Sequence, residues 1–334
     1  SRYSHYRGSS NIGVSRGGKE GNNAFMHDSS IYYQRYSYYS LQDHFTDALE
    51  DTLALPQISF PSLRTLYYLF EDYHYIIKSG FEDVLRAGNR RTAARMINEL
   101  DYSDAGFNFL HHEVLAYEHG QELSPIRTPA SITKLGFSNI TPLHCACIHP
   151  SSKYLEQFLK AKPDAIGITD NDGYGLVHYA AASETPEALK VLLKANVNIR
   201  ETVQDVSPLM LAARYGRVEN INIILANQEP AYAKVLLEQT GQEKATALHF
   251  AATYNQVDAI RVLVAYSKQT AEKIIEQAIK EAGENLKRKP TTPLSTYIDK
   301  PNKVRQTPLS VAAMHGDMAA VQVLLELGAK IDKP

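Results

Sequence analysis

One short segment, Thr141-Pro142-Leu143-His144-Cys145-Ala146, gives the first indication of the fold of this 334-residue chain. Its residue types suit the start of an α-helix. The Thr hydroxyl can cap the helix, and Pro fits the first turn because its missing N–H would be unpaired there. Leu and Ala are suited to the interior, and the His side chain can bond the backbone of a neighbouring turn. The segment matters because it recurs.

Four further copies of the hexapeptide follow, and they begin at Gly175, Ser207, Thr246 and Thr307. The spacings between successive starts, by subtraction, are 34, 32, 39 and 61 residues. A unit of about 33 residues explains the first two spacings. The third then carries about six extra residues and the fourth about 28, relative to that unit. The chain is therefore a repeat array with two insertions.

A second pattern follows each hexapeptide, namely an apolar helix that ends in small residues or Gly, as in residues 188–195 and 320–329. Together the two patterns resemble the ankyrin-repeat family over residues 79–334. The resemblance implies an all-α solenoid of helix-turn-helix units, each packed on its neighbours. We expect repeats with starts near residues 79, 108, 141, 175, 207, 246 and 307, the first two of them degenerate.

Departures from the repeat pattern predict where the solenoid is irregular. Residues 141–245 are expected to hold three regular repeats. After Thr246, a second helix is expected from Ala259 to Tyr266, followed by a separate extra helix over residues 270–285 within an insertion at 270–306. Residues 121–137 contain two prolines and no good helical period, so we expect a loop that replaces or delays an outer helix.

The N-terminal region differs in composition from the array. Residues 1–39 are a polar tail rich in Tyr, Ser, Gly and Arg, with five basic and two acidic residues, and we expect them to be disordered or irregular. Interleaved Arg, Gly and Tyr leave open an RNA- or DNA-associated module. Residues 40–78 show an aromatic and aliphatic stripe at helical spacing, which predicts a helical cap over the first repeat.

The overall composition excludes several classes of function. The net charge of −2 gives no general attraction to nucleic acid, so nucleic-acid partners are not expected for the array. No apolar run approaches the roughly 20 residues of a membrane span. Cys145 and Cys147 are unsuited to a mutual disulfide, which fits a reducing compartment and an intracellular location, nuclear or cytoplasmic. The first residue is Ser and the last residues end where another turn would begin, so we expect a longer natural protein.

Chemistry-bearing residues do not form a recognisable catalytic or cofactor site in the sequence. His144, His178 and His249 share one motif position in successive units about 10 Å apart, too far to share a metal ion. No phosphate-binding loop or nucleophile elbow is present. We therefore expect no enzymatic activity, no cofactor and no metal for this chain.

A binding surface is the remaining expectation. In the ankyrin family, the turn tips and the exposed positions of the first helix line one concave groove. The resemblance places Ala182 and Ser183 on that groove, and it implies a partner-binding set made of Asn171, Asp172, Tyr174, Arg214, Tyr215, Thr253, Tyr254, Met314 and His315. Tyr, Arg and Met are typical of binding hot spots. The planar donor fork of Arg214 suits an acidic or C-terminal carboxylate on a protein or peptide partner.

Residues 136–147, together with the long N-terminal region, also resemble the ankyrin segments of large tankyrase-like poly(ADP-ribose) polymerases. That resemblance implies a substrate-recruiting fragment of a nuclear ADP-ribosyl transferase. The catalytic domain would then lie outside these 334 residues.

Overall fold

The computed structural model describes residues 81–99, 107, 109–116, 129–226, 228–282 and 296–331. The expected tail (1–39) and cap (40–78) lie outside these ranges. Within them the chain is helical, and the only extended pairings are two isolated bridges, Thr169 with Gly175 and Val203 with Val206. The all-α expectation is confirmed for this part of the molecule. No helix in it is long and apolar enough to cross a membrane.

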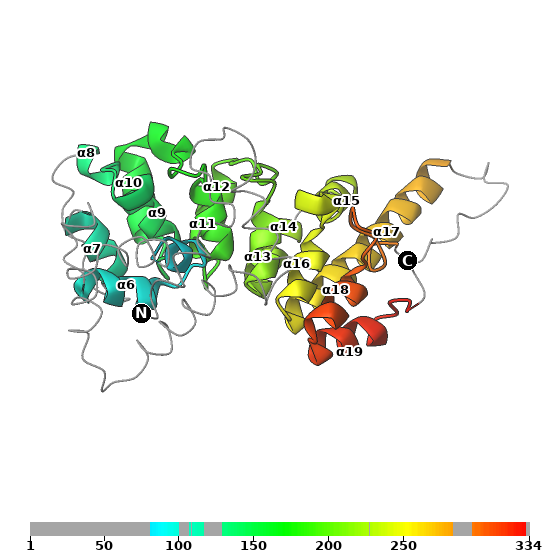
Figure 1. Cartoon of the computed structure of the whole chain (residues 1–334). Helices are drawn as coiled ribbons and strands as arrows, with labels where there is room; N and C mark the ends of the chain where they lie inside the picture. The colour runs from blue at the N-terminus through cyan, green and yellow to red at the C-terminus, as the bar shows by residue number, and fades with distance from the viewer. Residues whose placement is uncertain are drawn as a thin grey trace, which may run out of the picture.

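The helices form two rows that run along an elongated molecule (Figure 1). The inner row consists of α7 (Phe109–Ala116), α9 (Pro142–Cys147), α11 (Leu176–Ala182), α13 (Pro208–Arg214), α16 (Ala247–Thr253) and α18 (Pro308–His315). The outer row consists of α10 (Lys153–Ala161), α12 (Glu187–Lys194), α14 (Val218–Leu225), α17 (Val257–Ala282) and α19 (Met318–Glu326). A helix at residues 81–86 and α6 (Arg90–Glu99) precede both rows.

The start of each inner helix follows from the motif chemistry. Pro occupies an early position of α9, α13 and α18, where no backbone N–H is needed. The Ser207 hydroxyl accepts a hydrogen bond from the Met210 N–H at 3.3 Å, and the Thr307 hydroxyl accepts one from the Ser310 N–H at 3.2 Å. These caps satisfy amide groups that an α-helix leaves unpaired at its start.

The motif histidines join neighbouring repeats. His178 Nδ1 accepts from the Gly175 N–H at 3.2 Å, and His249 Nδ1 accepts from the Thr246 N–H at 3.1 Å. In both rings the proton is therefore on Nε2. Nε2 of His178 donates to the Glu201 carbonyl at 3.1 Å, and Nε2 of His249 donates to the Gln306 carbonyl at 3.1 Å. Each of these rings links its own helix start to the turn of the following repeat. The expected backbone-bonding role of the His is confirmed.

The core runs through the whole stack because every inner helix contributes equivalent residues to it. The motif leucine is buried in each repeat, as seen for Leu143, Leu176, Leu209, Leu248 and Leu309. Small residues beside it, such as Ala212 and Ala251, are also buried and let adjacent helices approach closely. Each repeat packs mainly on its neighbours, as in a solenoid.

Two expectations about the insertions were wrong. The interval from Ser207 to Ala245 is not a regular repeat, because it holds an additional helix, α15 (Pro230–Glu238), after α14. Pro230 suits a new helix start, and Ala233, Leu236 and Leu237 give this helix a buried face against α17. The extra length of this interval therefore forms a helix and not a longer loop.

The separate helix expected over residues 270–285 is instead the second half of α17, which continues without a break for 26 residues. Between Val257 and Ala282 the sequence has neither Gly nor Pro, so nothing interrupts the backbone hydrogen bonds. Within residues 121–137, where a loop was expected to replace or delay an outer helix, α8 (Pro129–Ile132) forms a single short turn. Residues 117–128 lie outside the described ranges.

Candidate functional site

The C-terminal ends of three neighbouring inner helices form a row of side chains that we call the downstream strip. It consists of Arg214 and Tyr215 at the end of α13, Tyr254 after α16, and Met314 and His315 at the end of α18. These residues occupy equivalent repeat positions, and α16 packs against both α13 and α18. The strip therefore crosses three repeats without interruption.

Arg214 is the centre of this strip. Its guanidinium carbon lies 4.6 Å from the ring centroid of Tyr254 and 5.4 Å from that of Tyr215. Such cation–π contacts hold a guanidinium flat against aromatic faces. The backbone beneath is fixed as well, because the Gln256 side-chain amide donates to the Arg214 carbonyl at 3.0 Å. All three side chains are half-buried, so the strip presents a positive group in an aromatic setting.

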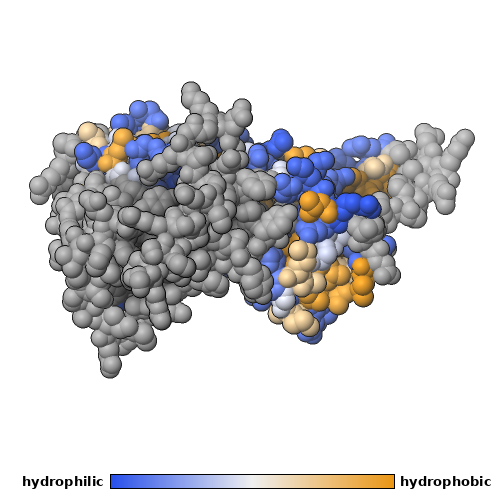
Figure 2. Space-filling model, in the orientation of Figure 1, coloured by the Kyte–Doolittle hydropathy of each residue, from blue (hydrophilic) through white to orange (hydrophobic). Residues whose placement is uncertain are grey.

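The far end of the strip is apolar. Met314 is 57% exposed, and its sulfur accepts a hydrogen bond from the Gln306 amide at 2.8 Å. Met318, at the start of α19, is 74% exposed. Figure 2 shows apolar surface gathered over the end of the molecule where α18 and α19 lie. An exposed pair of flexible methionines suits contact with an irregular apolar partner surface.

The expectation that Thr253 is exposed was wrong. Its side chain is buried, so Thr253 does not belong to the strip. The side chain is 5% exposed, and its hydroxyl donates to the His249 carbonyl at 2.8 Å. The hydroxyl turns back to the preceding helical turn, as Thr often does inside a helix. Thr253 therefore shapes α16 rather than contacting a partner.

The other predicted residues lie further up the array, on a surface that we call the upstream strip. It comprises the turn from Asp170 to Tyr174 and the end of α11 at Ala182 and Ser183. Asn171 is exposed, whereas Asp172 and Tyr174 contact the guanidinium of Arg86. Ala182 and Ser183 are buried, contrary to the expected exposure. The chain itself covers this part of the groove.

Arg86 and Asp170 were missed by sequence reasoning. The signal available was an Arg inside an apolar helix, Val84-Leu85-Arg86, since an isolated buried charge requires an acidic partner. Nothing in the sequence identified which of the chain's acidic residues, here Asp170, lies against it.

The buried histidines have structural rather than ligand-binding surroundings. Burial lowers the pKa of His111 to about 3 and the pKa values of His144, His178 and His249 to about 4. His111 Nε2 lies 2.8 Å from the Ile140 carbonyl, in the same arrangement as the other repeats. Within the described ranges, no three His, Cys, Asp or Glu side chains gather in a way that could hold a metal ion. Cys145 and Cys147 are buried free thiols.

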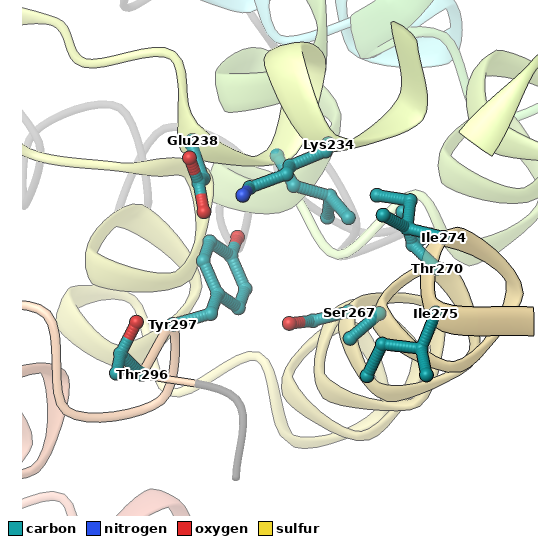
Figure 3. A pocket seen from close by; sticks show the side chains of 10 residues that line it. Lys234, Glu238, Ser267, Thr270, Ile274, Ile275, Thr296 and Tyr297 are labelled. Atoms are coloured by element: carbon teal, nitrogen blue, oxygen red, sulfur yellow. The ribbon is translucent and has the colours of Figure 1, made fainter. Parts of the chain in front are cut away.

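A cavity of about 190 Å³ lies where the two inserted segments meet (Figure 3). Its apolar wall includes Leu237 of α15 and Ile274 of α17, and Tyr297 closes one side. Lys234 and Glu238 lie at its polar edge (Figure 3). The volume is below the roughly 300 Å³ at which pockets for drug-sized ligands begin, and it matches one or two side chains better.

A comparison with known protein families agrees with this architecture. The family described as ankyrin repeats (3 copies) matches residues 143–234 and 209–334. A poly [ADP-ribose] polymerase tankyrase from Caenorhabditis elegans is 26% identical over 345 aligned positions, which cover 96% of this chain. Inversin from Canis lupus familiaris is 31% identical over 129 positions, which cover 38% of it. The ankyrin repeat domain of Bcl-3 superimposes with a TM-score of 0.43 at 18% identity, covering 73% of this chain and 97% of that domain.

The chain spans only a small part of these relatives. The matched region is 13% of the tankyrase and 12% of the inversin sequence.

Proposed function

Because this chain belongs to the ankyrin-repeat family, we propose that it is a protein-interaction module whose partner lies along the downstream strip. Ankyrin repeats are generally modules of protein–protein interaction. The partner is a protein or peptide that crosses the ends of α13, α16 and α18. A nucleic-acid partner is not favoured, because the chain has a net charge of −2.

The observation that supports this proposal best is the Arg214 guanidinium held over the rings of Tyr254 and Tyr215. A guanidinium in a fixed plane can receive a carboxylate through two parallel hydrogen bonds. The two Tyr rings offer large contact areas with few rotatable bonds to immobilise. We therefore assign the partner an acidic side chain or C-terminal carboxylate at Arg214, followed by an apolar side chain against Met314.

A displayed library of peptides with free C-termini tests the proposal. Selected peptides are measured against the parent chain and against a variant with Arg214→Ala and Tyr215→Ala. Loss of a central anchor should cost at least about 2 kcal/mol, which is about thirtyfold in affinity. The fold should survive, because both residues are half-buried at a helix end.

Lys190→Ala is the matched control, since Lys190 is exposed on outer helix α12 and its ammonium group pairs with Glu187 of the same helix at 2.7 Å. Amidated copies of the selected peptides separate a C-terminal carboxylate from an acidic side chain. Unchanged affinity of the selected peptides for a normally melting double variant would place the binding surface elsewhere.

We also propose, as a second candidate, that the chain is the substrate-recruiting part of a larger ADP-ribosyl transferase of tankyrase type. The specific support is that similarity to the Caenorhabditis elegans tankyrase covers 96% of the chain, whereas similarity to inversin covers 38%. The activity would reside in residues outside these 334. Assaying the complete natural polypeptide for ADP-ribosyl transfer, beside the 334-residue chain alone, tests this candidate. Transfer by neither would contradict it.

An intracellular site of action, nuclear or cytoplasmic, is part of the proposal and fits the two free thiols. An RNA- or DNA-associated role for residues 1–39 stays a prediction from sequence, since those residues lie outside the described ranges. Binding of the whole chain to single-stranded RNA, with and without residues 1–39, tests that role. Equal RNA binding by the chain with and without residues 1–39 would contradict that role.

A further inference from the structure

A groove of about 670 Å³ lies on the outer row of helices, where the inserted helix α15 follows α14. We call it the outer groove. Its floor consists of half-buried apolar and aromatic side chains from the end of α12, the turn after it, α14 and α15, namely Leu193, Val197, Ile223 and Tyr232. The volume lies in the range of about 300–1,000 Å³ that is usual for ligand pockets. None of the residues that line the outer groove belongs to the downstream strip.

The inserted helix α15 supplies one wall of this groove. Ala233, Leu236 and Leu237 bury one face of α15 against α17. Tyr232 lies just before that face and is only half-buried, so its ring is left to line the outer groove. The groove therefore depends on the inserted helix and not on the repeat motif.

The charged lining of the outer groove is positive. Its polar side chains are two lysines, Lys190 and Lys194, and three amides, and among the described residues that line the groove none is Asp or Glu. The Lys190 ammonium already pairs with Glu187 at 2.7 Å. Lys194 is exposed and forms no ion pair within the described ranges. The charge of Lys194 is therefore available to a ligand.

The preceding repeat shows how the charges of α12 differ from those of its neighbour α10. Both helices reach their C-terminal ends in the tripeptide Leu-Lys-Ala, which makes Lys160 of α10 equivalent to Lys194. Four positions earlier, α10 has Glu156 where α12 has Lys190. Side chains at this spacing are neighbours on a helix, where opposite charges attract and like charges repel. An anion from outside the helix would relieve the repulsion in α12, whereas α10 carries its own.

We propose that the outer groove binds a segment of a partner protein that carries an acidic side chain next to a bulky apolar one. The carboxylate pairs with Lys194, and the apolar side chain lies on Ile223 and Tyr232. The amide of Gln228, which also lines the groove, is suited to a hydrogen bond with the backbone of the segment. A basic segment is disfavoured, because like charges placed together across an interface are costly.

A displayed library of random peptides without free C-termini, selected on the full parent chain, tests this proposal. The selected peptides are first measured against the variant with Arg214→Ala and Tyr215→Ala, which removes the downstream strip. Peptides whose affinity is unchanged in that variant are the probes for the outer groove. They should share an acidic residue beside Leu, Met or Phe. This result is independent of the downstream strip, because the two surfaces share no residue.

Lys194→Glu is the first groove variant, and Lys160→Glu is its matched control at the equivalent position of α10. The affinity of the probe peptides should fall at least about tenfold, or about 1.4 kcal/mol, in Lys194→Glu and stay at the parent value in Lys160→Glu. Both variants should melt alike, since both lysines are exposed in the last turn of an outer helix.

Tyr232→Ala tests the floor of the groove separately from its charge. Tyr266→Ala is the control, because Tyr266 is also half-buried on an outer helix but does not line the groove. The probe peptides should lose affinity in Tyr232→Ala only. The proposal is overturned if no peptide binds independently of Arg214 and Tyr215. Probe peptides that bind Lys194→Glu and Lys160→Glu equally well, or that lack an acidic residue, would overturn it too.

Discussion

The side-chain nitrogen of Asn220 on α14 lies 2.8 Å from the carbonyl oxygen of Ser183, at the end of α11 in the preceding repeat. The same nitrogen lies 2.9 Å from the Ala181 carbonyl and 3.2 Å from the Ala180 carbonyl. A helix leaves its last carbonyls without intrahelical partners, and buried ones must find a donor elsewhere. One amide from the next repeat supplies it, so Asn220 fixes the stacking of two units.

Asn220→Ala should therefore destabilise the array by about 1–3 kcal/mol, the cost of leaving buried polar groups unsatisfied. The measurement is the midpoint of urea unfolding. Asn222→Ala, at a half-buried position two residues along the same helix, is the control for helix propensity. Equal midpoints for the two variants would show that water replaces the Asn220 amide at no cost.

The buried motif leucines give a second prediction. Leu209→Ala and Leu248→Ala should each cost about 2–5 kcal/mol by leaving cavities between repeats. Leu209 is 1% exposed and Leu248 is fully buried, whereas Leu325 is 40% exposed and serves as the control. Midpoints that fall no further for the two core variants than for Leu325→Ala would mean that the repeat interface collapses around the lost side chain.

The repeat architecture was predictable because its information is local and repeated. Thr141 to Ala146 contains the cap, the Pro at the first turn, the buried Leu and the bonding His, and the hexapeptide recurs down the chain. The insertions were less predictable, since the length of a helix depends on what it packs against. A helix was predicted over residues 270–285, but its continuity with the first half of α17 was not.

Contacts between distant segments were the least predictable part of the site. Tyr215 and Tyr254 were identified because they follow the motif at a fixed offset. Their shared contact with Arg214, and the burial of Thr253, depend on side-chain directions that the repeat pattern does not encode. The pairing of Arg86 with Asp170 joins residues 84 positions apart, and no periodicity links them.

The stack over Arg214 gives a third prediction. Tyr254→Leu keeps an apolar side chain but removes the aromatic face, whereas Tyr254→Phe keeps the face and removes the hydroxyl. The loss of one partly exposed cation–π contact should cost about 0.5–1 kcal/mol. Thermal unfolding should therefore show a lower midpoint for Tyr254→Leu than for Tyr254→Phe. The reverse order would indicate that the hydroxyl, and not the ring, holds Arg214.

The fourth prediction concerns acid. The pKa of His249 falls from 6.5 to about 4 through burial, so the folded chain resists a proton that the unfolded chain accepts below pH 6.5. The unfolded state then binds more protons than the folded state as the pH falls, and stability falls with it. One pKa unit corresponds to about 1.4 kcal/mol. The free energy of unfolding should therefore fall by about 2 kcal/mol for each such His between pH 7 and pH 5. His144 and His178 should add to the effect, since their pKa values are lowered in the same direction.

His249→Gln separates titration from capping. Gln three residues after Thr246 makes a Thr-x-x-Gln capping box, in which the Gln side chain accepts from the Thr246 N–H as His249 Nδ1 does at 3.1 Å. The variant therefore keeps the bond but has no group that titrates between pH 7 and 5. Urea midpoints over that range should fall less steeply for His249→Gln than for the parent. His315→Gln, at a half-buried surface position, should follow the parent. If the urea midpoints of the parent and of His249→Gln fall equally steeply with pH, the prediction is contradicted. His249 would then accept a proton in the folded array while its contact with the Gln306 carbonyl stays in place.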